Sequence, residues 1–96
     1  MDRAMLLEHL AVALRHVSEG ERHIAQQHEI IASLERDGFD TSAAKAVLLQ
    51  FEEIQGMHIA HRDRLKKELL LQFEELQGMH IAERDRLKKE LGESSD

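Results

Sequence analysis

Residues 48–91 consist of one 22-residue segment that occurs twice in succession without a spacer. The first copy, at 48–69, reads LLQFEEIQGMHIAHRDRLKKEL, and 20 of its 22 positions recur unchanged in the second copy at 70–91. The copies differ only at Ile54 against Leu76 and at His61 against Glu83. Such near-identity indicates a recent in-frame duplication, either natural or engineered, and requires one fold to accommodate the same segment twice.

The length of the repeat suits an α-helix. At about 100° per residue, 22 residues advance about six turns plus roughly 40°, so an apolar stripe continues across the junction nearly in line. The 96-residue chain contains no proline, and its Ala, Leu, Glu, Lys and Arg content is typical of long helices. We therefore predict a single all-α domain spanning residues 1–96.

Local signals predict two helices of unequal length. The first helix is expected over residues 3–36, because Gly38 is placed to end it in a left-handed conformation. A turn at 37–41 follows, in which Asp40 or Thr41 caps the second helix. That helix is expected over residues 42–91, with Gly92 beginning a tail at 92–96. A short turn makes the helices antiparallel neighbours, so the end of the second helix projects beyond the first.

Apolar residues form two lines on the predicted second helix. The main stripe contains Val47, Phe51, Ile54, His58, Leu65, Leu69, Phe73, Leu76, His80, Leu87 and Leu91. A second line contains Leu48, Ile59, Leu70 and Ile81, on a side that one partner helix is not expected to cover together with the main stripe. The predicted first helix carries its own stripe of Leu6, Leu10, Ala13, Val17, Gly20, Ile24, Ile31 and Leu34.

A lone two-helix hairpin of this size buries little apolar surface, which favours self-association. The expected partner is a second copy of the chain, in a homodimer that forms a four-helix bundle or coiled coil. A domain-swapped or higher assembly is the alternative, because pairings displaced by 22 residues present almost the same side chains. The predicted oligomer interface consists of Leu48, Ile59, Leu70, Phe73, Leu76, Ile81, Leu87 and Leu91.

Charge and motifs exclude several classes of function. The formal net charge of −6 disfavours nucleic-acid binding, and no apolar run approaches the ~20 residues of a membrane span. The beginning of the chain lacks the pattern of a signal peptide, so a cytoplasmic location is expected. No nucleophile motif, phosphate loop or dinucleotide fingerprint occurs, so we predict that the chain is not an enzyme.

Seven histidines raise the question of a metal or haem site. His9, His16 and His23 are spaced by seven residues, about 10 Å apart along a helix, which is too far for one metal ion. His58 and His61 lie three residues apart, and their copies are His80 and Glu83. We predict no cofactor, with a divalent metal or haem held by such histidines as the alternative, and His58, His61, His80 and Glu83 as the candidate metal ligands.

Residues 1–69 resemble a group of short, uncharacterised bacterial proteins built as helical hairpins. The resemblance rests on HIAQQHEIIASLERDGFDT and on the first copy of the repeat. It implies a helical hairpin and brings no known activity. This chain departs from that pattern through the second copy of the repeat. The sequence as a whole therefore predicts a self-associating helical interaction or structural module, with a histidine-based metal- or haem-binding bundle as the alternative.

Overall fold

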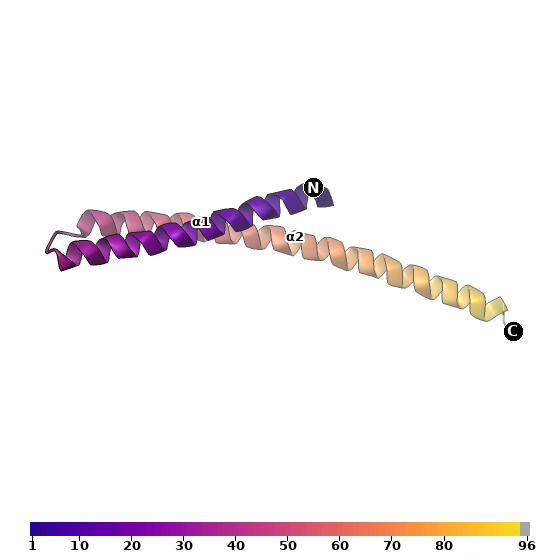
Figure 1. Cartoon of the computed structure of the whole chain (residues 1–96). Coiled ribbons are helices and arrows are strands. Elements are labelled where there is room, and N and C mark those ends of the chain that lie inside the picture. Colours follow the sequence, from indigo (N-terminus) through magenta and orange to yellow (C-terminus); the bar gives the residue numbers. More distant parts are fainter. Residues whose placement is uncertain (95–96) are drawn as a thin grey trace.

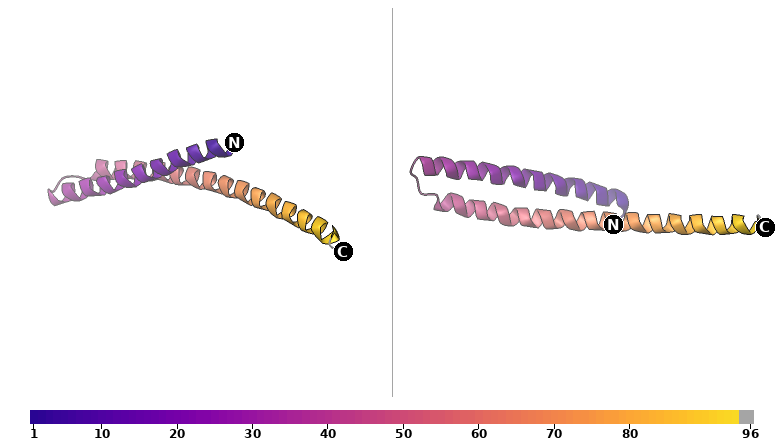
Figure 2. Two further views of the ribbon diagram at one scale, coloured as in Figure 1. Left: turned by 45° about the vertical axis from the view of Figure 1, so that its right-hand side comes forward. Right: turned by 90° about the horizontal axis from the view of Figure 1, so that it is seen from below.

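The computed structural model describes the backbone of residues 1–94 and the side chains of residues 1–92. Helix α1 spans Arg3–Arg36 and helix α2 spans Ser42–Ser94, with 34 and 53 residues respectively. The two helices lie side by side as an antiparallel hairpin, from which the C-terminal part of α2 projects (Figures 1 and 2). The molecule measures 88 × 22 × 14 Å. The predicted all-α hairpin with a long second helix is confirmed.

Hydrogen bonds at both ends of α1 define its length. The side chain of Asp2 accepts a hydrogen bond of 2.9 Å from the backbone N–H of Met5 at the N-terminus. At the C-terminus, Gly38 adopts a φ of 77° and donates to the carbonyl of Glu35, while Phe39 donates to the carbonyl of Leu34. This pair of bonds is the Schellman motif, and only a residue that tolerates a positive φ closes it without strain.

Asp40 organises the start of α2. Its carboxylate accepts hydrogen bonds from the backbone N–H of Ser42 at 2.9 Å and from the Ser42 hydroxyl at 2.7 Å. Thr41 contributes its backbone carbonyl to the first helical bond, from Lys45. The two predicted capping residues therefore share the role. The bonds from Ser42 lower the pKa of Asp40 from its ordinary value of 3.8.

Asp40→Ala should lower the thermal midpoint of unfolding slightly at neutral pH, because the first turn of α2 loses two hydrogen bonds. A lowered pKa means that the ionised carboxylate stabilises the folded state above its ordinary pKa of 3.8 and loses this effect as the pH falls through the folded pKa. The difference between the unfolding midpoints of the two proteins should therefore be largest at pH ~7 and should shrink as the pH falls below 3.8. A constant difference across this range would contradict the assignment.

The core of the hairpin follows a spacing of alternately four and three residues, which is the heptad pattern of a coiled coil. Each residue of the two series is buried or half-buried, and Leu6 is fully buried beside Ala13 and Leu65. The series on α1 is Leu6, Leu10, Ala13, Val17, Gly20, Ile24, Gln27, Ile31 and Leu34. The series on α2 is Ala44, Leu48, Phe51, Gln55, His58, Arg62, Leu65, Leu69 and Gln72.

The stripe predicted on α1 is confirmed, whereas the prediction for α2 was partly wrong. Val47 and Ile54 of the predicted main stripe are 36% and 48% exposed. Leu48 and Ile59, which the sequence pattern places on a separate line, are half-buried in the hairpin. The reason is that the contacts with α1 recur every 3.5 residues, whereas the helix has 3.6 residues per turn. The line of contacts therefore shifts gradually around α2, and α1 faces different sides of α2 along its length.

Helix α2 runs without a break through the junction between the two copies at Leu69 and Leu70. It also continues past Gly92 to Ser94, so the helix does not end at the predicted residue, and residues 95–96 of the predicted tail lie outside the described residues. Gly56 and Gly78 face open space, because no other described atom lies within 4 Å of the point that a Cβ would occupy. In the described range, no helix combines the length and apolar character needed to cross a membrane.

Candidate interaction surface on the second repeat

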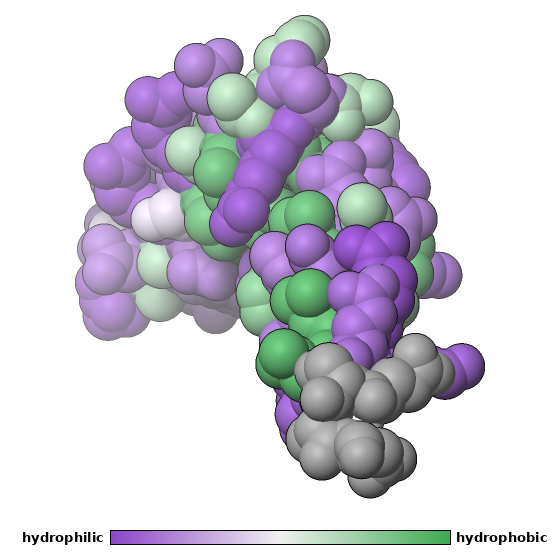
Figure 3. Space-filling model, turned by 90° about the vertical axis from the view of Figure 1, so that its right-hand side faces the viewer, coloured by the Kyte–Doolittle hydropathy of each residue, from purple (hydrophilic) through white to green (hydrophobic). Residues whose placement is uncertain are grey.

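The part of α2 that follows Gln72 extends beyond α1 and exposes its apolar side chains. Gln72 itself still reaches α1, because its amide donates to the carbonyl of Met1 at 3.1 Å. Figure 3 views this end of the molecule and shows hydrophobic surface exposed between hydrophilic areas. The large apolar residues exposed in the second repeat are Leu70, Leu71, Phe73, Leu76, Met79, Ile81, Leu87 and Leu91. Six of these eight belong to the predicted oligomer interface.

The equivalent side chains of the first repeat are covered by α1 and are much less exposed. Leu65 is 5% exposed in the core of the hairpin, whereas its copy Leu87 is 48% exposed. Phe51 is half-buried beside the ring of His23, while its copy Phe73 is 50% exposed. The second repeat therefore carries copies of the side chains that pack against α1 in the first repeat, and in the single chain these copies are exposed.

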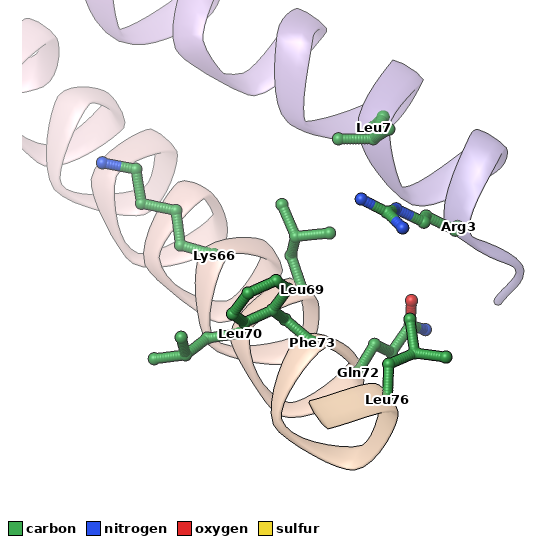
Figure 4. Close-up of a pocket in the computed structure, with 8 residues that line it drawn as sticks. All are labelled: Arg3, Leu7, Lys66, Leu69, Leu70, Gln72, Phe73 and Leu76. Atoms are coloured by element: carbon green, nitrogen blue, oxygen red, sulfur yellow. The ribbon is translucent and has the colours of Figure 1, made fainter. Parts of the chain in front are cut away.

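An apolar cavity of about 360 Å³ opens where α1 begins and α2 starts to project. Leu7 and Arg3 extend from α1 toward α2, and Leu69 and Phe73 lie on the facing side (Figure 4). Leu7, Leu70, Phe73 and Leu76 are each at least 40% exposed although they line this space. The full lining consists of Arg3, Leu7, Lys66, Leu69, Leu70, Gln72, Phe73 and Leu76.

The structure places the predicted metal ligands in different surroundings. The ring of His58 lies 5.1 Å from the ring of His16 on α1, and His61 lines a cavity together with His9 and His16. Their copies His80 and Glu83 are exposed on the projecting part of α2. Among the side chains of residues 1–92, no three histidines, aspartates or glutamates are grouped closely enough to hold one metal ion. The four candidates are thus divided between the covered and the projecting parts of α2.

The predicted oligomer interface is divided in the same way. Leu48 and Ile59, in the first repeat, are half-buried within the chain's own hairpin. The six interface residues of the second repeat are exposed: Leu70, Phe73, Leu76, Ile81, Leu87 and Leu91. The candidate surface is therefore the second repeat together with the cavity at its base.

Sequence reasoning missed the glutamines that join the two helices. Gln27 donates to the carbonyl of Ala44, and Gln55 donates to the carbonyl of Val17, each at 2.8 Å. Both amides are buried, and that of Gln55 occupies the space left by the absent side chain of Gly20. The signal was present in the spacing, because both glutamines occupy heptad core positions.

Comparisons with known proteins provide no relative for this chain. No protein-family model matches the sequence, no curated protein is significantly similar to it, and no solved structure matches the fold significantly.

Proposed function

We propose that this chain is a self-associating helical interaction module without catalytic activity, and that the second repeat is its interaction surface. The observation that supports this proposal most directly is the contrast between the copies. Leu65 lies buried against α1 in the first repeat, while Leu87, in the same local sequence, lies exposed. A second chain that covered the second repeat would remove this apolar surface from water, which favours association by roughly 25 cal/mol for each Å² buried.

Sedimentation equilibrium tests this proposal. The full chain should form a dimer at concentrations on the order of 100 µM, and Phe73→Gln/Leu87→Gln should remain monomeric under the same conditions. The matched control is Leu49→Gln/Met57→Gln, which changes two exposed apolar residues of the first repeat that lie away from the stripe. The control should still dimerise. A wild-type chain that stayed monomeric, or equal effects of both double variants, would contradict the proposal.

A second candidate function is metal binding by histidines that lie near one another on α1 and α2. The observation in its favour is the pair of rings of His16 and His58, whose centroids lie 5.1 Å apart, near His61, which lines a cavity together with His16. Titration with Zn²⁺, followed by calorimetry, should then show binding to the wild-type chain and a clear loss of binding in His58→Ala or His61→Ala. Binding that is equal in all three proteins, or absent from the wild type, would remove this candidate.

A further inference from the structure

An apolar stripe begins at Leu69, the last leucine of the hairpin core, and continues along the projecting part of α2 with the same spacing in both directions. Its seven positions lie within about 80° of one another around the helix. Their spacing is four, three, four, four, three and four residues, so His80 stands at the centre. In order, they are Leu69, Phe73, Leu76, His80, Arg84, Leu87 and Leu91. Such a pattern coincides with itself when a second copy of the helix is laid against it in the opposite direction.

The chain contains a second copy of the residues that contact α1 but only one α1. Five of the seven stripe positions are copies of residues in the hairpin core: Phe73, His80, Arg84, Leu87 and Leu91. To move from the first repeat to the second within one chain, α1 would have to shift by about 33 Å, whereas the five residues of the turn at 37–41 span at most about 20 Å. Donation of α1 to a neighbouring chain would expose as much of the first repeat as it covered of the second. The remaining surface that matches the second repeat is the second repeat of another chain.

We propose that residues 69–91 of two chains pair antiparallel about a two-fold axis at His80, which rests on the proposed function and specifies its partner surface. In this register Leu69 meets Leu91 of the partner subunit, and Phe73 meets Leu87 of the partner subunit. Each hairpin keeps its own α1. The interface is isologous and closes at two chains.

The cavity at the base of the projecting part is placed to receive the end of the partner helix. Leu69 and Phe73 line it on α2, and Leu7 lines it on α1. The antiparallel register brings Leu91 of the partner subunit to this point. The cavity, with a volume of about 360 Å³, opens on the same side of α2 as the apolar stripe.

The polar residue Arg84 of the stripe has an equivalent at the helix interface of the hairpin. Leu76 would meet Arg84 of the partner subunit, and Arg84 is the copy of Arg62. The side chain of Arg62 is only 25% exposed, because it lies along the interface with α1. An arginine at this position can therefore pack its aliphatic part against an apolar partner while its guanidinium group reaches solvent.

Charge favours the antiparallel arrangement over a parallel one. Residues 70–79 contain two glutamates and no basic residue, while residues 80–91 contain four basic and three acidic residues. Antiparallel pairing places residues 70–79, with a net charge of −2, against the C-terminal half of the other repeat, with a net charge of +1. Glu83 then lies within one turn of His80 of the partner subunit. A histidine at 83, as at the equivalent His61, would instead bring four histidines together around the axis.

Single cysteine variants test the register, because the chain contains no cysteine of its own. His80→Cys should give a disulfide-linked dimer on mild oxidation, since the two residues face each other across the axis. Phe73→Cys should not cross-link alone, whereas Phe73→Cys/Leu87→Cys should form a covalent dimer. His58→Cys is the matched control, because this copy of position 80 faces the chain's own α1, and it should remain unlinked.

Other results would overturn the register. Cross-linking of Phe73→Cys alone as efficient as that of His80→Cys would indicate a parallel pair. A covalent dimer of Leu10→Cys/Leu87→Cys would show that α1 of a second chain occupies the second repeat. A dimer that requires Phe73 and Leu87 in sedimentation but cross-links at none of the predicted positions would retain the proposed function and reject this pairing.

Discussion

Leu65→Ala should destabilise the hairpin by about 2–4 kcal/mol, whereas Leu87→Ala should leave the stability of the isolated hairpin unchanged. Leu65 is 5% exposed and packs against Leu6 and Ala13, so its truncation leaves a cavity that two helices cannot close. Leu87 lies in an identical local sequence and is 48% exposed. The comparison therefore changes burial while it keeps residue type, helix and neighbouring sequence constant.

Urea unfolding followed by circular dichroism provides the measurement. At low protein concentration, Leu65→Ala should shift the midpoint strongly, and Leu87→Ala should coincide with the wild type. At higher concentration the wild type should gain stability through association, and Leu87→Ala should lose part of this gain. Equal destabilisation by the two substitutions at low concentration would show that α1 does not distinguish the copies.

Gly20→Ala should reduce the stability of the chain by about 1–2 kcal/mol, although glycine to alanine in a helix normally adds up to about 1 kcal/mol. A Cβ at position 20 would overlap the buried amide of Gln55, which would have to leave the carbonyl of Val17. Gly56→Ala is the matched control, because no other described atom lies near its Cβ position. It should stabilise the chain.

The double variant Gly20→Ala/Gln55→Ala identifies the cause of the loss. Removal of the glutamine leaves room for the new methyl group, so the double variant should be more stable than Gly20→Ala alone. Chemical denaturation of the wild type, Gly20→Ala, Gln55→Ala and the double variant gives the coupling free energy between positions 20 and 55. Additive effects would indicate that the conformational freedom of Gly20, and not the space it leaves, determines the result.

Much of the fold could be predicted from short signals. Gly38 and Asp40 mark the turn, and the absence of proline allows α2 to continue through both repeats. The stripe on α1 was correct in all eight positions, because its regular apolar pattern follows the heptad. The projection of the second repeat follows from the unequal lengths of the helices, so the exposure of Leu87 required no tertiary information.

The face of α2 that binds α1 was less predictable. Val47 and Ile54 are more apolar than Gln55, yet Gln55 is buried and they are exposed. The difference arises because Gly20 leaves room for the amide, and Val17 supplies an acceptor for its hydrogen bond. Neither condition is visible within α2 alone. Similarly, the proximity of His16 to His58 depends on the register of the hairpin.

Because α2 continues without a break from one copy of the repeat into the next, its length can change in steps of one repeat. Each added unit would move the C-terminus outward by about 33 Å and turn its side chains by roughly 40°. Gene amplification or deletion of whole units would thus set the reach of the molecule in fixed increments while the turn and α1 stayed the same.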